Sequence, residues 1–169
     1  MVMLAVFLFL LKLIFNHVKI DQFSYATETI EICCVKISSS NSYTNILGIY
    51  RPHSDNIGNF SLALENIINH SQLSNASCVI AGDLNINLMS NAGDVELFAD
   101  MMRTHHYIQT ITGVTRSGCG RSTPSLIDHI WINQLCNYNS GVLQTGITDH
   151  FTLFIQLPFF QEKKKTWKK

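Results

Sequence analysis

Short apolar runs, each about the length of one β-strand, most constrain what this chain can fold into. They occupy 29–37, 43–50, 78–82, 125–132, 141–147 and 151–157. The sequence SSSNS separates the first two runs and is a turn signal, so we expect 29–50 to form a hairpin. Strands outnumber helices and include both hairpins and crossovers, which predicts a mixed α/β fold. A length of 169 residues fits about one domain.

Two intervening segments, 59–73 and 93–106, have the apolar spacing of amphipathic helices. Asn59 is the expected N-cap of the first and Asp94 that of the second. The residues expected to face the core are Phe60, Leu64, Ile67 and Ile68 in the first helix, and Phe98, Met101 and Met102 in the second.

The net charge of zero hides an uneven distribution. Five of the 12 basic residues lie in 163–169, whereas residues 1–160 hold 7 basic against 11 acidic residues. An acidic body lacks the basic patch of a general nucleic-acid binder, so any contact with phosphate is expected to need a metal cation. The basic tail at 161–169 is either a solvated end or a nuclear localisation signal.

The first 15 residues, MVMLAVFLFLLKLIF, are strongly apolar. They lack a basic start and an A-x-A-like cleavage site, and they are too short to span a bilayer. We expect a buried strand, with a secretory signal as the alternative, and no membrane partner. The cysteines have no metal-ligand spacing, so we expect reduced core residues in an intracellular protein: Cys33, Cys34, Cys78, Cys119 and Cys136.

Three segments place polar residues where an apolar core would not favour them. Asp83 and Asn85 follow the run 78–82, and Asp128 shares its face of the run 125–132 with apolar side chains. Asp149 and His150 lie in the link between the last two runs. Each has an ordinary structural alternative, since Asp and Asn often end strands by bonding their own backbone.

One chemical arrangement accounts for all three segments. A buried Asp128 would orient the imidazole of His150, unless it pairs with Arg116 or Arg121 instead. Asp83 and Asp149 would then supply oxygen ligands for Mg²⁺ and activate a water. His129 lies on the opposite face of its strand from Asp128, so we expect it to be packed or exposed.

Taken in order, five motifs resemble those of the endonuclease/exonuclease/phosphatase superfamily. They are GIYRP (48–52), IAGDLNINL (80–88), TR (115–116), SLIDHIW (125–131) and TDHF (148–151). The most similar branch is the endonuclease domain of non-LTR (LINE-type) retrotransposons, and the similarity covers about 28–157. It implies a four-layered α/β sandwich of two mostly antiparallel sheets flanked by helices, within a domain over 1–160.

The resemblance also assigns catalytic roles. Asp83 matches the aspartate that activates or orients the attacking water, and Asn85 the residue that positions it. His150 matches the histidine that contacts the scissile phosphate, supported by Asp128. Asp149 matches the aspartate beside it, near the metal.

Further assignments from the resemblance concern the rim of the site. Tyr50 matches a tyrosine that contacts phosphate, and Thr115 and Arg116 lie where the family has a loop that touches DNA. The implied activity is DNA endonuclease chemistry with Mg²⁺ or Mn²⁺.

The sequence departs from the family pattern upstream. The family begins with strands that carry an Asn and a metal-binding Glu, and neither is found, because Glu28 and Glu31 lie too close to a later strand. Leu84 and Thr148 replace the usual Phe and Ser, which are mild changes. We therefore expect an N-terminally truncated domain that is very slow. The alternatives are an inactive remnant or interaction module, and a phosphatase or phosphodiesterase of another branch of the superfamily.

Overall fold

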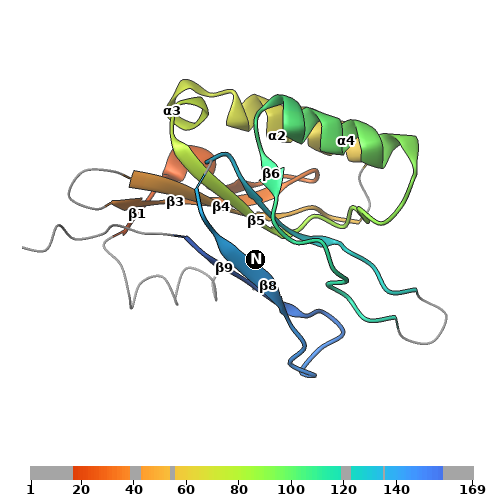
Figure 1. Ribbon diagram of the computed structural model, residues 1–169. Coiled ribbons are helices and arrows are strands. Elements are labelled where there is room, and N and C mark those ends of the chain that lie inside the picture. The colour runs from red at the N-terminus through yellow and green to blue at the C-terminus, as the bar shows by residue number, and fades with distance from the viewer. Residues whose placement is uncertain (1–16, 39–42, 54–55, 119–122, 135, 158–169) are drawn as a thin grey trace, which may run out of the picture.

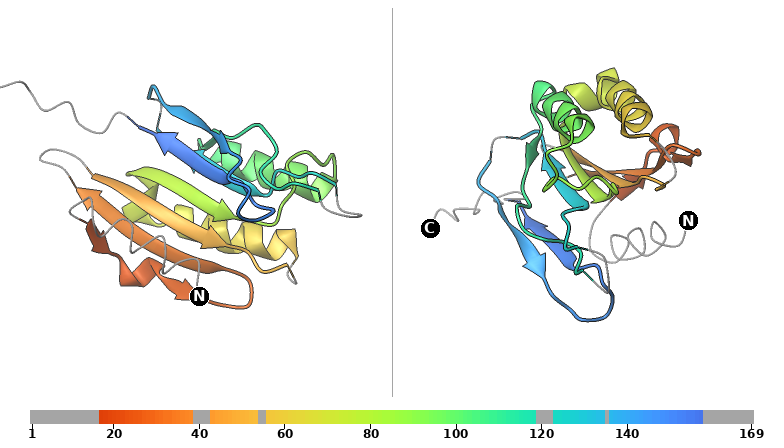
Figure 2. Two further views of the ribbon diagram at one scale, coloured as in Figure 1. Left: turned by 90° about the horizontal axis from the view of Figure 1, so that it is seen from below. Right: turned by 90° about the vertical axis from the view of Figure 1, so that its right-hand side faces the viewer.

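A computed structural model describes residues 17–157 except 39–42, 54–55, 119–122 and 135. The described elements form three layers (Figures 1 and 2). Helices α2 (Ile57–Ile68) and α4 (Gly93–Thr104) cover one face of a larger sheet, and a small sheet packs against its other face. The two packed sheets and the helical layer are those of the expected sandwich, and in the described segments no helix covers the outer face of the small sheet.

The larger sheet has seven strands in the order β1-β3-β4-β5-β7-β6, with β2 also paired to β3. Its strands are β1 (His17–Lys19), β2 (Tyr25–Ala26), β3 (Glu31–Ser38), β4 (Tyr43–Tyr50), β5 (Ser77–Asp83), β6 (Ile108–Gln109) and β7 (Asp128–Ile132). Only β4 and β5 are parallel, joined through α2 and the short helix α3 (Ser71–Ser74); a 3-10 helix, η1 (Asp21–Phe23), follows β1. The predicted hairpin over 29–50 is confirmed as antiparallel β3 and β4.

The small sheet is a hairpin of β8 (Asn139–Leu143) and β9 (Thr152–Gln156). Its apolar side chains cover the sheet face that the helices leave free: Val142, Leu153 and Ile155 pack on Val79, Ile130 and Ile132. Both of its strands were expected, although β8 begins and ends earlier than the predicted run 141–147.

The two main helices bury the apolar faces that their spacing predicts. Phe60, Leu64, Ile67, Ile68, Phe98 and Met102 are buried, and Met101 packs at the edge of the same cluster. The ring of Phe98 lies 6.1 Å from that of Phe60, so the helices share one core on the sheet.

Both predicted N-caps are wrong. Helix α2 begins two residues before Asn59, because Asn56 Oδ1 accepts the Gly58 N–H at 2.6 Å. Helix α4 has Ala92 at the N-cap position. Asp94 lies inside the first turn, where its carboxylate accepts the Val95 N–H at 3.0 Å.

The remaining terminal predictions fall largely outside the described residues. The apolar segment 1–15 and the basic tail 161–169 are not described, and neither is Cys119. The other cysteines are free, three of them buried as predicted: Cys33, Cys34 and Cys78. No helix in the described ranges is both long and apolar enough to cross a bilayer.

His129 connects β7 to the loop that follows β5. Its side chain is fully buried, and its Nε2 lies 2.9 Å from the Ile86 carbonyl oxygen. The Trp131 indole N–H donates to its Nδ1 at 3.3 Å, so Nδ1 is the acceptor and Nε2–H donates to Ile86. Burial lowers the pKa of His129 to about 4, so the ring is neutral in the folded protein at pH 7.

Gly82, the residue before Asp83, allows β5 to approach β4 closely. Its φ is +152°, and a Cβ atom there would lie 1.8 Å from the Ile49 carbonyl oxygen. Both the contact and the backbone conformation require glycine.

We expect Gly82→Ala to destabilise the protein by at least about 3 kcal/mol, because the methyl group would force β4 and β5 apart. Urea unfolding measures this change. Gly93→Ala is the matched control, since Gly93 has no atom within 4 Å of an added Cβ and lies in a helix. An unchanged midpoint in Gly82→Ala would contradict the close approach.

We also expect acid to weaken the fold through His129. In the unfolded chain the ring titrates near pH 6.5, whereas in the folded protein it stays neutral until about pH 4. The unfolded state therefore takes up the proton first, and stability present above pH 6.5 falls by about 2 kcal/mol on reaching pH 5. Urea unfolding between pH 7 and pH 5 measures how the free energy of unfolding falls with pH. We expect a smaller fall in His129→Gln than in the wild type, and an identical fall in both proteins would contradict the prediction.

Candidate active site

Asp83 and Asp128 are directly opposite each other across the β5–β7 ladder. Both are largely buried, with 9 % and 7 % of their surfaces exposed. Like charges in opposed positions repel, and burial increases the cost of keeping both ionised. Burial and then the negative charge of Asp128 raise the pKa of Asp83. The site thus concentrates negative charge, and a bound cation would reduce the repulsion between the two carboxylates.

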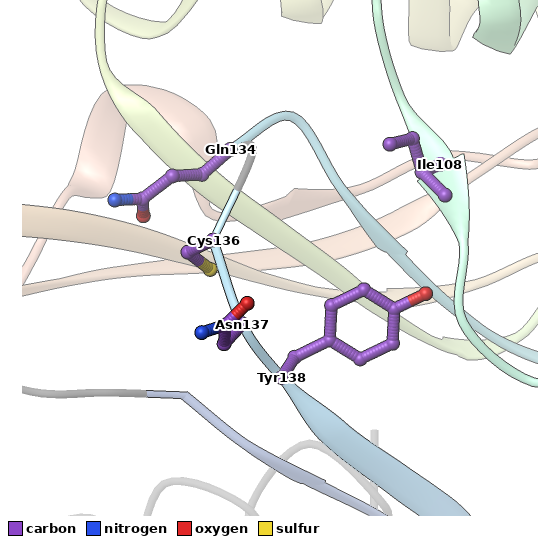
Figure 3. Close-up of a pocket in the computed structure, with 5 residues that line it drawn as sticks. All are labelled: Ile108, Gln134, Cys136, Asn137 and Tyr138. Atoms are coloured by element: carbon purple, nitrogen blue, oxygen red, sulfur yellow. The ribbon is translucent and has the colours of Figure 1, made fainter.

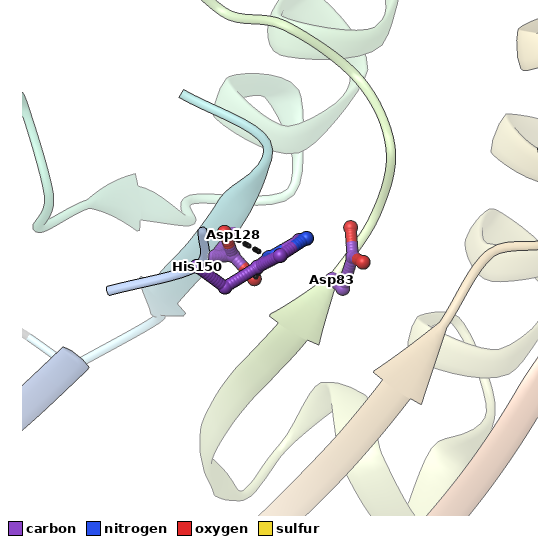
Figure 4. A group of neighbouring side chains, drawn as sticks. All are labelled: Asp83, Asp128 and His150. Atoms are coloured by element: carbon purple, nitrogen blue, oxygen red, sulfur yellow. Dashed lines mark hydrogen bonds and ion pairs between the residues drawn. The ribbon is translucent and has the colours of Figure 1, made fainter. Parts of the chain in front are cut away.

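His150 approaches the same pair from the turn before β9. Its Nδ1 lies 3.1 Å from each carboxylate oxygen of Asp128, and the ring extends from Asp128 towards Asp83 (Figure 4). An ionised carboxylate only accepts hydrogen bonds, so Nδ1 carries the donated proton. Nε2 has no hydrogen-bond partner within the part of the chain described here, which leaves it available to a ligand. The expected contact of Asp128 with His150 is therefore present.

Together these side chains form a donor set suited to a divalent cation. One ligand atom from each of Asp83, Asp128 and His150 can be chosen so that all lie within 4.8 Å of one another. Carboxylate oxygens are ligands that suit both Mg²⁺ and Mn²⁺. The raised pKa of Asp83 is consistent with such a use, because a bound cation would offset the charge of Asp128.

Asp149 lies next to His150 in sequence but not in this cluster. Its Oδ2 accepts the Arg116 Nε–H at 2.7 Å, and this hydrogen bond lowers the pKa of the carboxylate. The pairing of Asp128 with Arg116, considered from the sequence, is thus replaced by the pair Arg116–Asp149; Arg121 lies outside the described residues. Backbone bridges also join Arg116 to Ser125 and to His150.

Asn85 has the structural role expected of a turn residue in GDLN, and its role in positioning a water stays a prediction. Its backbone N–H donates to Asp83 Oδ1 at 3.1 Å, as in an ordinary Asx turn. Its φ is +50°, a conformation that Asn tolerates better than most residues. Its side-chain Nδ2 donates to the Arg51 carbonyl oxygen at 2.8 Å, so this amide hydrogen holds the loop.

Thr115 is expected in a loop that touches DNA, and its side chain is fully buried. Its Oγ1 accepts the N–H groups of Ile127 and Asp128 at 3.1 and 3.0 Å, which fixes the start of β7.

Tyr50 ends β4, and because β4 and β5 are parallel, it lies at the same end of the sheet as Asp83.

Sequence reasoning missed Arg51, the most buried charged side chain near the site. It is 4 % exposed and donates to the carbonyl oxygens of Leu84 and Asn85. The motif GIYRP was a usable signal, because it carries this arginine at the end of a strand. His53, also unforeseen, contributes a nearby charge that lowers the pKa of Asp83 in part.

A separate hollow of about 450 Å³ lies at the other end of β7 (Figure 3). It is open and lined by Ile108, Gln134, Cys136, Asn137 and Tyr138. Ile108 pairs with Ile132, four residues along β7 from Asp128, which is roughly 13 Å along a strand. The hollow is therefore not part of the Asp83 cluster.

No family model and no curated protein matches this sequence. Solved structures do match its fold. The endonuclease domain of TRAS1, a telomere-specific non-LTR retrotransposon, has a TM-score of 0.71 at 11% identity, over 87% of this chain and 70% of that one.

Two other structures are similar over shorter shares of their length. An endonuclease/exonuclease/phosphatase family protein from Leptotrichia buccalis has a TM-score of 0.57 at 14% identity, over 76% of this chain and 54% of its own. The AP endonuclease LMAP from Leishmania major has a TM-score of 0.56 at 12% identity, over 73% and 53%. The chain thus spans little more than half of each of these two. It has the α/β-sandwich fold of the endonuclease/exonuclease/phosphatase superfamily.

Proposed function

We propose that the protein is a metal-dependent phosphodiesterase that nicks DNA, related to the endonucleases of non-LTR retrotransposons. One observation carries the proposal: His150 bonds both oxygens of Asp128 while its other nitrogen is available beside Asp83. An imidazole oriented by a buried carboxylate, next to a second carboxylate of raised pKa, is suited to acid–base chemistry at phosphate.

Each residue has a distinct role in the proposed reaction. The water oxygen would bond to phosphorus as the P–O bond to the leaving ester oxygen breaks, and Asp83 would orient this water and accept its proton. His150 donates from Nε2 to an oxygen of the scissile phosphate, and Asp128 holds the ring in place through Nδ1. Asp83 and Asp128 would also hold Mg²⁺ or Mn²⁺, which when bound neutralises charge that develops on the phosphate.

Nucleic acid is the proposed substrate class for three reasons. Two of the similar structures are titled endonucleases, and the five sequence motifs occur in the order of the retrotransposon branch. Arg116 also lies beside the site with a partly exposed guanidinium, where Asp149 fixes its direction. A guanidinium in that place can contact a phosphate next to the cleaved one.

The test is nicking of supercoiled plasmid in Mg²⁺ and in Mn²⁺ by the wild-type chain, His150→Ala and Asp83→Asn. We expect slow nicking that depends on the metal, reduced on the order of 10²- to 10⁴-fold in either variant, because each removes a group that acts on the reacting phosphate or water.

His105→Ala is the matched control. His105 Nε2 bonds Glu65 at 2.9 Å between α2 and α4, so this variant also loses a partly exposed histidine–carboxylate pair, but one far from the reaction. It should nick like the wild type. Wild-type nicking no faster than that of His150→Ala would overturn the enzyme assignment and leave an inactive remnant of the same fold. Cleavage of a small phosphomonoester without nicking would overturn the choice of DNA.

A further inference from the structure

Arg51 makes several hydrogen bonds to the loop that carries Asp83. Its backbone N–H donates to the Asp83 carbonyl oxygen at 3.0 Å. Its guanidinium Nε donates to the Leu84 carbonyl oxygen and its Nη2 to that of Asn85, each at 2.7 Å. In return Asn85 Nδ2 donates to the Arg51 carbonyl oxygen at 2.8 Å. We call these four hydrogen bonds the Arg51 clamp.

We propose that Arg51 is a positioning residue, whose clamp holds the loop 83–85 so that the Asp83 carboxylate faces Asp128 and His150. The inference rests on the proposed function, because it assigns a task to that same site. The hydrogen bonds of the clamp reach the backbone of Asp83, Leu84 and Asn85, so Arg51 would act through the position of the loop.

The chemistry of arginine explains why this position needs it. Its planar guanidinium presents donors in a fixed fork, which here reaches two successive carbonyl oxygens. Asn85 is held at φ +50°, so these carbonyls point away from any regular ladder and need other donors. A buried carbonyl without a donor is costly, so the clamp and the turn stabilise each other.

Pro52 prepares the arginine for this role. A proline disfavours the helical conformation of the residue before it and pushes that residue to extended backbone. Arg51 thus continues the direction of β4 beyond Tyr50, where its backbone N–H meets Asp83 at the end of the neighbouring parallel strand. The order Arg51-Pro52 in GIYRP thus has a physical explanation, because Pro52 favours the extended backbone that Arg51 needs.

The Asp83 carboxylate depends on the same loop for its orientation. Its Oδ1 accepts the Asn85 N–H, and the Leu84 N–H donates to the Ile127 carbonyl oxygen at 3.0 Å, next to Asp128. If the loop shifts, Asp83 loses both its own hydrogen bond and its register opposite Asp128.

The test compares Arg51→Gln and Arg51→Lys with the wild type, and with Arg103→Gln as a matched control. Arg103 is an exposed arginine of α4 whose partner is Asp100. Two measurements are made below the unfolding transition: plasmid nicking in Mn²⁺, and amide hydrogen exchange by NMR without metal. Neither replacement reproduces the fork, so both Arg51 variants should lose nicking on the order of 10- to 100-fold, and Arg103→Gln none.

Hydrogen exchange decides whether the effect is local. We expect the amides of Leu84 and Asn85 to exchange about tenfold faster or more in both Arg51 variants, while Val79 and Ile80 in β5 change little. Equal acceleration at all four would mean that Arg51 only stabilises the fold, and would overturn the clamp. Unchanged exchange at the loop would overturn it as well.

The outcomes for the clamp and for the proposed function are separable. A wild-type chain that does not nick contradicts the proposed function, while exchange at Leu84 and Asn85 still decides on the clamp. Wild-type nicking that is matched by Arg51→Gln contradicts the clamp alone. Full activity in Arg51→Lys would show that charge rather than the fork matters, and would also overturn it.

Discussion

The repulsion between two opposed aspartates is the constraint on which the described site depends. Asp83 is the last residue of β5 and Asp128 the first of β7, and the two are paired across the sheet. An apolar or oppositely charged pair would be more favourable at such a position. His150 offsets part of this cost by bonding Asp128. Burial and then the charge of Asp128 raise the pKa of Asp83, and the remaining negative charge explains why the cluster is suited to a cation.

The surrounding fold holds this unfavourable pair together from several sides. Gly82 lets β5 lie against Ile49 of β4, and Thr115 fixes the first amides of β7. The Arg51 clamp holds the loop after β5, and His129 joins that loop to β7 at Ile86. Most of these supports are buried and polar, so each is costly unless its hydrogen bonds are complete. Rigidity at the site therefore comes from satisfied polar contacts as well as from the apolar core.

Local patterns predicted more of the fold than of the site. The 29–50 hairpin and both helical faces follow from apolar spacing, which local sequence carries. The Asp128–His150 contact could be predicted because a lone carboxylate on an apolar strand face needs a partner. The Arg51 clamp could not, since its acceptors lie up to 34 residues further along the chain. The Arg116–Asp149 pair could not be predicted either, since its partners lie 33 residues apart, and the place of Asp149 near a metal stays a prediction.

The most direct measurement of the central claim is Mn²⁺ binding followed by electron paramagnetic resonance, with the wild-type chain and Asp83→Asn side by side. If Asp83 and Asp128 hold one cation beside His150, the wild type binds a single Mn²⁺ whose affinity falls on the order of tenfold or more in the variant. Equal binding in the two proteins, or none at millimolar metal, would contradict the account that the opposed aspartates exist to hold a cation.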